Sequence, residues 1–148
     1  MTGLEVRLAG PADLPAAYAL RHEVFVVGQG VPEDMELDEH DATCDHAVGL
    51  RDGLVVATGR LLPPGAPGRA AVVGRMAVAE QARGQGVGAS VLALLERRAA
   101  ERGWPAVELH AQLHARAFYE RAGYVPYGEV YLEAGIEHLS MRKQLPGA

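Results

Sequence analysis

The 148-residue sequence predicts a single α/β domain in which helices flank a mixed sheet. Three observations support this. In some short runs apolar residues alternate with polar ones, as in half-buried strands, and in others they recur at helical spacing. Strand-type and helix-type runs follow one another along the chain, as in mixed α/β folds. A chain of this length is one ordinary domain, so we expect residues 1–148 to form one unit.

The first half of the chain is predicted as a strand, a helix and three strands. Residues 5–8 alternate and form the first strand, and a helix starts at Asp13, a plausible N-cap. Gly28 and Gly30 end the helix, and an acidic loop follows. Asp52-Gly53 separates two apolar runs and is typical of a hairpin. These strands cover 46–50, 54–62 and, after a Pro- and Gly-rich loop at 63–68, residues 71–78.

The second half alternates helix and strand. A long helix over about 87–102 buries Val91, Leu92, Leu94 and Leu95, and Gly103 follows as a left-handed cap. The next elements are a strand at 106–111, a short helix at 115–122 closed by Gly123, and a last strand at 136–143, so that the sheet ends in one or two strands.

Composition excludes several classes of protein. The chain is 49% hydrophobic and 22% charged, which is typical of a globular protein and not of a disordered one. The single cysteine, Cys44, cannot form an internal disulfide and fits a reducing compartment. Neither a signal peptide nor an apolar stretch of about 20 residues is visible, and no basic stripe suits a nucleic acid. We therefore expect a cytoplasmic protein without membrane or nucleic-acid partners, while a homodimer remains open.

The net charge of −5 is concentrated in one segment. Six acids and no bases lie between residues 33 and 41, and the remaining 13 acids are balanced by 14 bases. Such a segment is a candidate site for a cation, either a metal or an amine. The alternative is a solvated loop that keeps the protein soluble.

A glycine-rich segment after the strand at 71–78 carries the clearest chemical signal. Gly84, Gly86 and Gly88 open the long helix, where free N–H groups and the helix dipole favour an anion. Arg83 lies just before them and adds a charged fork for a phosphate. The segment therefore predicts a pyrophosphate cradle. The alternative is a turn that only packs the helix against the sheet.

Two common phosphate ligands fit this segment poorly. A nucleoside triphosphate loop needs a lysine after its glycines, and none follows. The spacing Gly84-x-Gly86-x-x-Ala89 fits a dinucleotide fingerprint, and Glu108 stands near the end of the next strand, where a ribose-binding acid is expected. That fingerprint places its first glycine at the strand tip, whereas here residues 79–83 intervene.

The motif Arg83-x-x-Gly86-x-Gly88 resembles the acyl-CoA-binding motif of the GNAT N-acetyltransferases. Residues 115–124, a short helix bearing a tyrosine and ending in Gly-Tyr, resemble the second signature of that superfamily. Flanking motifs at 21–29, 36–41, 128–129 and 135–138 are similar to its ElaA-like branch, although Gly28 stands where that branch commonly has Glu. The resemblance covers nearly the whole chain and implies a mostly antiparallel central sheet flanked by helices.

The resemblance also implies a set of residues that bind acetyl-CoA. The pantetheine arm would pair like an extra strand with the end of the strand at 71–78, and the N–H of Val78 would meet the thioester oxygen. Gln112 stands where many members carry an Asn that bonds the arm. The implied cofactor-binding residues are Met76, Ala77, Val78, Arg83, Gly84, Gln85, Gly86, Val87, Gly88, Ala89, Gln112, Phe118, Tyr119 and Arg121.

Catalytic roles follow from what acetyl transfer to an amine requires. Tyr119 is the predicted general acid for the departing thiolate, because a phenol holds its proton at pH 7; the alternative is a core aromatic residue. His110 and His138 are the candidate bases, although a histidine in a strand is often structural. Glu36 and Asp38 are predicted to attract a cationic substrate.

The cluster of possible metal ligands at 40–46 lacks a second paired set, and acyl transfer from a thioester needs no metal. Cys44 is also conceivable as an acyl-carrying nucleophile, but no sequence feature marks it as activated. We therefore predict an acetyl-CoA-dependent N-acetyltransferase that acts by direct attack in a ternary complex and uses no metal. The alternatives are a non-catalytic acyl-CoA-binding module and a dinucleotide-dependent oxidoreductase.

Overall fold

The computed structural model describes residues 3–146, which form a seven-stranded sheet in the order β1-β2-β3-β4-β5-β7-β6. Among these residues, neighbouring strands run antiparallel except for β4 and β5, which are parallel. The mixed α/β fold expected from the sequence is confirmed. The strands are β1 (Leu4–Leu8), β2 (Asp45–Arg51), β3 (Leu54–Leu62), β4 (Ala71–Val78), β5 (Ala106–Gln112), β6 (Val125–Glu133) and β7 (Ile136–Gln144).

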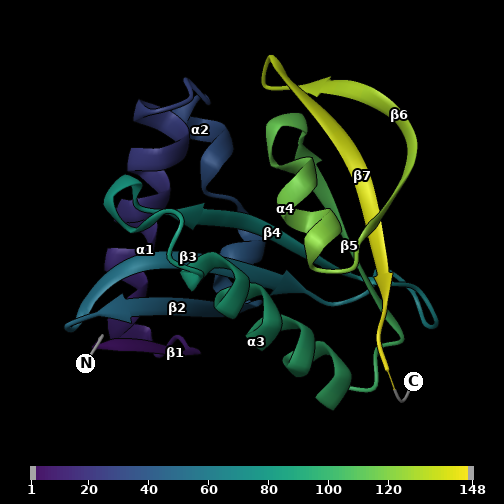
Figure 1. Cartoon of the computed structure of the whole chain (residues 1–148), viewed down its shortest axis with the longest axis horizontal. Coiled ribbons are helices and arrows are strands. Elements are labelled where there is room, and N and C mark those ends of the chain that lie inside the picture. Colours follow the sequence, from purple (N-terminus) through teal and green to yellow (C-terminus); the bar gives the residue numbers. More distant parts are fainter. Residues whose placement is uncertain (1–2, 147–148) are drawn as a thin grey trace.

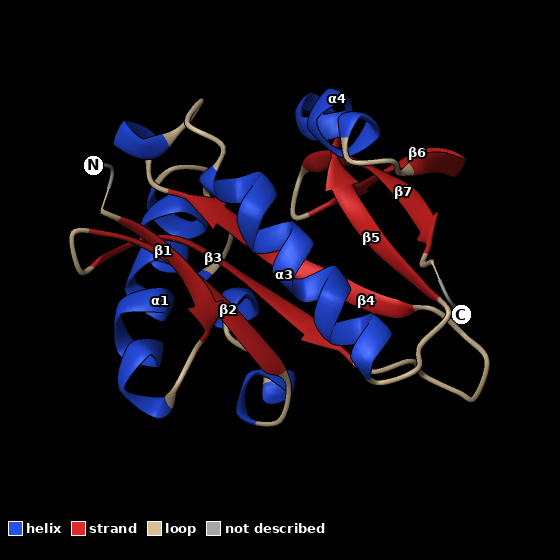
Figure 2. Ribbon diagram, turned by 60° about the horizontal axis from the view of Figure 1, so that its bottom comes forward, coloured by secondary structure: helices blue, strands red, loops and turns tan. Residues whose placement is uncertain are grey.

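Helices cover both faces of the sheet (Figure 2). The long helix α3 (Val87–Glu101) crosses one face of the first four strands and buries Val91 and Leu95 there. The opposite face packs against α1 (Leu14–Arg21), whose Ala17 lies against Val48 and Leu50 of β2. The shorter helices are α2 (Glu33–Glu36) and α4 (Arg116–Arg121). In the described part of the chain, none of the helices is both long and apolar enough to cross a membrane.

Several local predictions are confirmed by the backbone. Asp52 and Gly53 form the β2–β3 turn with positive φ angles of 52° and 83°. Gly103 and Gly123 follow α3 and α4 with φ angles of 77° and 99°, in the left-handed conformation expected after a helix. The last two elements are strands, β6 and β7, which form a hairpin at the sheet edge.

Other local predictions need correction. Asp13 precedes α1, but its carboxylate bonds the Gly10 amide and Arg7 and does not cap the helix. The sequence predicts one continuous helix here, but α1 ends at Arg21 and the chain goes on as a π-helical segment, His22–Val27. Leu94 is only partly buried. The acidic segment contains the four-residue helix α2 and a 3₁₀ turn, Glu39–Ala42, because ion pairs with distant arginines hold it in place.

Candidate active site

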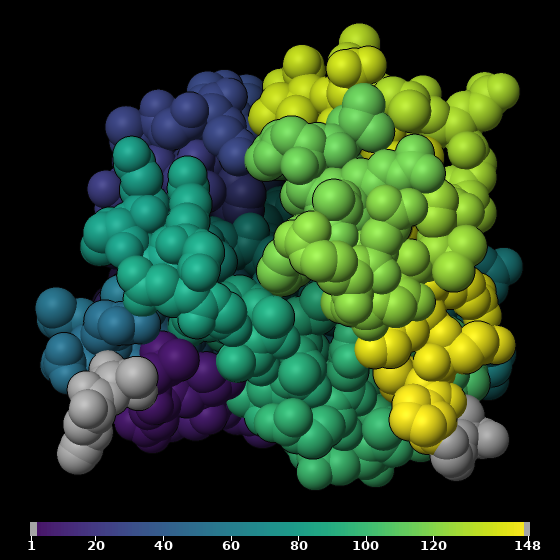
Figure 3. Space-filling model, viewed as in Figure 1, coloured from purple at the N-terminus to yellow at the C-terminus, as the bar shows by residue number. Residues whose placement is uncertain are grey.

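β4 and β5 begin side by side and then separate. Their parallel pairing joins residues 71–73 to residues 107–109 and ends there. The carboxyl ends of the two strands therefore diverge, and both ribbon views show the strands moving apart (Figures 1 and 2). On the molecular surface, a notch separates the teal loop after β4 from the green atoms of α4 (Figure 3). Gaps of this kind at strand ends are common ligand sites in mixed folds.

The end of β4 offers a backbone donor to this opening. The N–H of Ala79 donates to the carbonyl of Val56 in β3 at 2.8 Å. Successive N–H groups of an extended strand point to opposite sides. The N–H of Val78 is therefore directed away from β3 and toward β5. This orientation suits the predicted contact of Val78 with a thioester oxygen, which stays a prediction.

The glycine-rich loop turns the chain from β4 into α3. Gly84 and Gly86 have φ angles of 78° and 84°, and a Cβ at either position would have no heavy atom within 4 Å. Both glycines are therefore present for their left-handed backbone and not to relieve crowding. Gly86 is the N-cap of α3, so the N–H groups of Val87, Gly88 and Ala89 lie at the helix N-terminus, where an anion is favoured.

Gly88 serves close packing instead. A Cβ on this residue would lie 3.1 Å from Cγ2 of Val78 and 3.6 Å from Cζ of Phe118. The first turn of α3, the end of β4 and α4 therefore meet at one point. The three sequence motifs predicted to hold the cofactor are thus close together, although they are up to 40 residues apart in the chain.

Arg83 folds back on the strand that precedes it. Its Nε donates to the carbonyl of Val78 at 3.1 Å, while the side chain remains exposed. The arginine is therefore at the mouth of the opening, next to the helix N-terminus. Arg121 is exposed on α4, and Gln85 is exposed and bonds the Gln81 carbonyl at 3.2 Å.

The side-chain amide of Gln112 has a partner that the sequence did not predict. It exchanges two hydrogen bonds, of 2.7 and 3.0 Å, with the amide of Gln29, which follows the π-helical segment. Its oxygen also lies 2.7 Å from Nε2 of His114. A cofactor contact at Gln112 would have to compete with these bonds. The pair links the α1–α2 connection to the end of β5.

Tyr119 lies in the core beside α3, with only 8% of its surface exposed. Its ring makes edge contacts with Phe118 at 5.0 Å and Tyr124 at 6.0 Å between centroids. Burial raises the pKa of Tyr119 to about 12. The phenol is therefore neutral at physiological pH, as a general acid must be before it reacts.

The two candidate bases lie on the other face of the sheet. Leu109 and Ala111 of β5 pack in the core with Tyr119, so the alternating His110 points to the opposite face. His110 Nδ1 lies 2.7 Å from the hydroxyl of Tyr131 in β6. His138 stands opposite Gln112 in the antiparallel register and therefore shares the face of His110.

Tyr131 joins the two histidines. Its ring stacks on His138 with centroids 5.8 Å apart, while its hydroxyl contacts His110. His138 Nδ1 lies 2.7 Å from the carbonyl of Ile136, to which it donates a hydrogen bond, so Nε2 is the ring nitrogen available to act as a base. Sequence reasoning missed Tyr131, because its place opposite His138 depends on the register between β6 and β7, which the sequence does not display.

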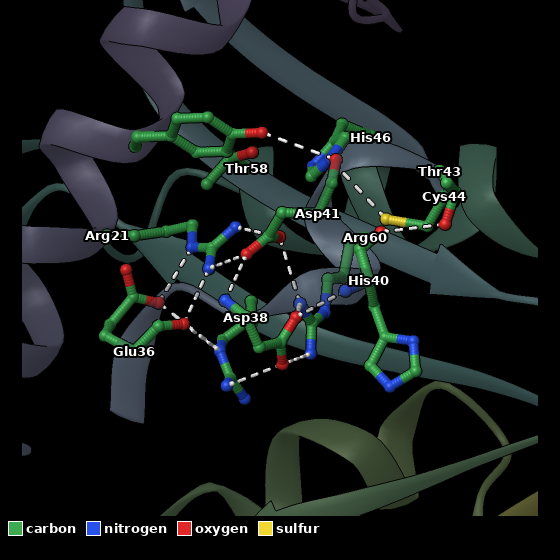
Figure 4. A network of polar contacts seen from close by, with 12 residues as sticks. Arg21, Glu36, Asp38, His40, Asp41, Thr43, Cys44, His46, Thr58 and Arg60 are labelled. Carbon is green, nitrogen blue, oxygen red and sulfur yellow. Dashed lines mark hydrogen bonds and ion pairs between the residues drawn. The ribbon is translucent and has the colours of Figure 1, made fainter. Parts of the chain in front are cut away.

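Glu36 and Asp38 are occupied by arginines, so the expectation that they attract a cationic amine is not supported. Glu36 is buried and accepts from Nε of Arg21 at 2.8 Å. Both carboxylate oxygens of Asp38 accept from Arg60, at 2.6 and 2.8 Å. Figure 4 shows these side chains facing one another around Asp41. Their negative charge is therefore balanced by arginine side chains of other elements.

The neighbouring cluster of Asp41, Cys44 and His46 brings three potential metal-ligand atoms within 4.8 Å of one another. Each group already has a protein partner. Asp41 accepts from Arg21 and Arg60, and His46 Nε2 lies 2.9 Å from the Asp41 carbonyl. Burial raises the pKa of the Cys44 thiol to about 11, which makes it a poor nucleophile at neutral pH.

Comparison with known proteins agrees with this geometry. Residues 39–145 match the profile of the acetyltransferase (GNAT) domain. The chain belongs to the GNAT family. Protein ElaA of Escherichia coli (strain K12) is 35% identical, over 90% of this chain and 89% of its own. This GNAT acetyltransferase is also 36% identical to the uncharacterized N-acetyltransferase YjcF of Bacillus subtilis (strain 168), over 88% of this chain and 91% of that protein.

Solved structures give the same result. The structure of E. coli ElaA superposes with a TM-score of 0.83 at 32% identity and covers 97% of this chain and 99% of its own. An acyl-CoA N-acyltransferase from Pseudomonas aeruginosa has a TM-score of 0.80 at 37% identity, with the same coverage. The predicted fold, family and acyltransferase class are therefore confirmed.

Proposed function

We propose that this GNAT acetyltransferase moves the acetyl group of acetyl-CoA to a primary amine by direct attack in a ternary complex. The observation that carries the proposal is the meeting of three elements at one opening: the separated end of β4, the N-terminus of α3 and the helix that bears Tyr119. The acyl-CoA N-acyltransferase that resembles this chain supports the choice of cofactor.

Each part of the opening has a role in this proposal. The N–H groups of residues 87–89 and the guanidinium of Arg83 hold the diphosphate. The edge of β4 at residues 76–78 receives the pantetheine arm, and the N–H of Val78 stabilises the oxyanion. Arg83 also bonds the Val78 carbonyl, so the same side chain orders the donor strand and the phosphate site.

The chemical step takes place at the opening, with Tyr119 on one face of the sheet and the two candidate bases on the other. The neutral amine attacks the thioester carbonyl carbon, the C–N bond forms and the C–S bond breaks. The thiolate takes a proton from the hydroxyl of Tyr119, while the nitrogen loses a proton to His110 or His138, directly or through water. Because burial raises the pKa of Tyr119 to about 12, this proton is available throughout the physiological range.

GNAT enzymes act on small-molecule or protein acceptors. We propose a small-molecule amine, without the cationic preference expected from Glu36 and Asp38, because those carboxylates are paired with arginines. We also propose that the enzyme works in the cytoplasm, where its half-buried thiol, Cys44, would remain reduced.

Substitution of Tyr119 tests whether the protein is an enzyme or a non-catalytic acyl-CoA-binding module. Tyr119→Phe should lower turnover about 100-fold, while the Kd for acetyl-CoA changes by less than about threefold. Turnover is measured by thiol release from acetyl-CoA with a panel of primary amines. Tyr124→Phe is the matched control, because it removes a neighbouring phenol that bonds Glu96 and not the opening.

The outcomes separate the proposals. Unchanged turnover in Tyr119→Phe would refute its role as the acid. Absence of turnover with every amine, combined with tight binding of acetyl-CoA, would favour the binding module. Thermal protection by NAD(P) but not by CoA would favour the oxidoreductase.

A further inference from the structure

Arg75 has an unusual backbone conformation in the middle of β4. Its φ angle is +53°, in the left-handed region that non-glycine residues rarely occupy. The other described non-glycine residues with positive φ, Asp52 and Ala134, lie in hairpin turns. A strained residue inside a strand costs about 1–3 kcal/mol and persists only where surrounding contacts hold it.

The strain accompanies a β-bulge. Arg60 of β3 pairs with Gly74, and Thr58 pairs with Ala77, so two residues of β4 face the single residue Gly59. A Cβ on Gly59 would collide with the sulfur of Met76, which shows how closely the bulged strand approaches β3. A bulge changes the side to which the following N–H groups point. It therefore determines that the N–H of Val78 is directed toward the opening.

The side chain of Arg75 ties this bulge to the segment around α2. Its Nε donates to the Glu36 carbonyl at 3.0 Å, and its Nη2 donates to the Met35 carbonyl at 3.2 Å. Two ion pairs add to these bonds, with Glu36 at 3.3 Å and Asp38 at 3.4 Å. Four contacts from one guanidinium require its planar fork, which a lysine lacks.

The partners of Arg75 are themselves held firmly. Glu36 is 4% exposed and bonds Arg21 of α1, which is 1% exposed. Asp38 bonds Arg60 of β3, which is 5% exposed. Burial, and then the nearby guanidiniums of Arg60 and Arg21, lower the pKa of Arg75. The fold therefore places a third arginine in this crowded cluster at an electrostatic cost.

We propose that Arg75 is a positioning residue that holds the bulge of β4, and through it the backbone of residues 76–78, in the orientation needed to bind acetyl-CoA. This inference rests on the proposed function. The acidic segment then has a role other than substrate attraction, because α2 is the element to which Arg75 ties β4.

Three variants test the tether. Arg75→Gly removes the guanidinium but adopts the left-handed backbone without strain, whereas Arg75→Ala removes the guanidinium and keeps the strain. Arg75→Lys keeps the charge without the fork. We expect acetyl-CoA to bind about tenfold more weakly to the Gly and Ala variants and to an intermediate extent to the Lys variant, as measured by calorimetry. Arg69→Ala, at the exposed loop before β4, is the matched control.

Amide hydrogen exchange supplies a readout that needs no ligand. In Arg75→Gly, the amide of Ala79, bonded to Val56, should exchange about tenfold faster, while the amide of Val48 in β2 changes less than about twofold. If Arg75 only stabilised the fold as a whole, its loss would accelerate the exchange of both amides together. If Arg75→Gly binds acetyl-CoA as tightly as the wild type and its Ala79 amide exchanges at the wild-type rate, the inference is wrong and the proposed function is unaffected. Failure of the wild-type protein to bind acetyl-CoA would overturn the proposed function, and local exchange would still decide whether the tether exists.

Discussion

Asp41 is the carboxylate on which the buried arginine cluster converges, so Asp41→Asn should strongly destabilise the protein. The side chain is 6% exposed and accepts from Arg21 at 2.7 and 3.1 Å and from Arg60 at 3.0 Å. It also accepts from the amide of Asp38 at 3.0 Å. The amide of an asparagine has nearly the same shape, but it brings an N–H₂ group against these donors and removes the negative charge.

The size of the effect follows from charge balance within the cluster. Arg21, Arg60 and Arg75 face Glu36, Asp38 and Asp41, so the variant leaves one buried positive charge without a partner. Breaking a buried pair in this way costs about 3–5 kcal/mol. For a chain of this size, each kcal/mol lowers Tm by roughly 2–4 °C, so we expect a decrease of about 6–20 °C.

Urea unfolding at pH 7 measures this free energy. Asp34→Asn, at an exposed position in α2, is the matched control and should change stability by less than about 0.5 kcal/mol. A loss below about 1 kcal/mol in Asp41→Asn would show that the cluster does not hold the acidic segment in place.

The pH dependence gives a second check on Asp41. Burial would raise its pKa, but the hydrogen bonds from Arg21 and the Asp38 amide, together with the charge of Arg21, hold the pKa well below its ordinary value. A lowered pKa in the folded state contributes stability above the unfolded pKa of about 3.9, and this contribution is lost as pH falls. The difference in stability between wild type and Asp41→Asn should therefore shrink below about pH 4.

Two further predictions concern packing and reactivity. Gly88→Val should lower the free energy of unfolding by about 1–3 kcal/mol and weaken acetyl-CoA binding, because its side chain would enter the space of Val78 and Phe118. The control Gly65→Val, whose side chain would lie in open space, should leave stability nearly unchanged. Urea unfolding measures both. Cys44 should react slowly with iodoacetamide at pH 7.5, because burial raises its pKa to about 11, and Cys44→Ser should retain turnover; rapid alkylation with loss of activity would contradict this.

Local chemistry explains which parts of the fold were predictable. The Asp52-Gly53 turn and the capping glycine Gly103 depend on the backbone freedom of single residues, which a sequence displays directly. Helix α3 has apolar residues at regular helical spacing. By contrast, α2 has only four residues, too few for a periodic pattern, and it is held by contacts with arginines 15 to 40 positions away.

The same distinction applies to the candidate site. The Gly84–Gly86 turn and Tyr119 belong to motifs that are continuous in sequence, and the structure brings these motifs together. The Gln29–Gln112 amide pair joins residues 83 positions apart, and the His110–Tyr131 contact depends on a strand register. The ion pairs of Glu36 and Asp38 could not be predicted from the acidic segment alone, because their arginine partners lie in other elements.

The most direct test asks whether the amides at the start of α3 bind a diphosphate. In an NMR titration of the wild-type protein, acetyl-CoA should shift the amide signals of Val87, Gly88 and Ala89 strongly. Acetylpantetheine, which lacks the diphosphate, should leave these three signals nearly unchanged while it shifts those of β4. If acetyl-CoA saturates the protein without moving the three signals, or does not bind at all, the assignment of this turn as the cofactor cradle is wrong.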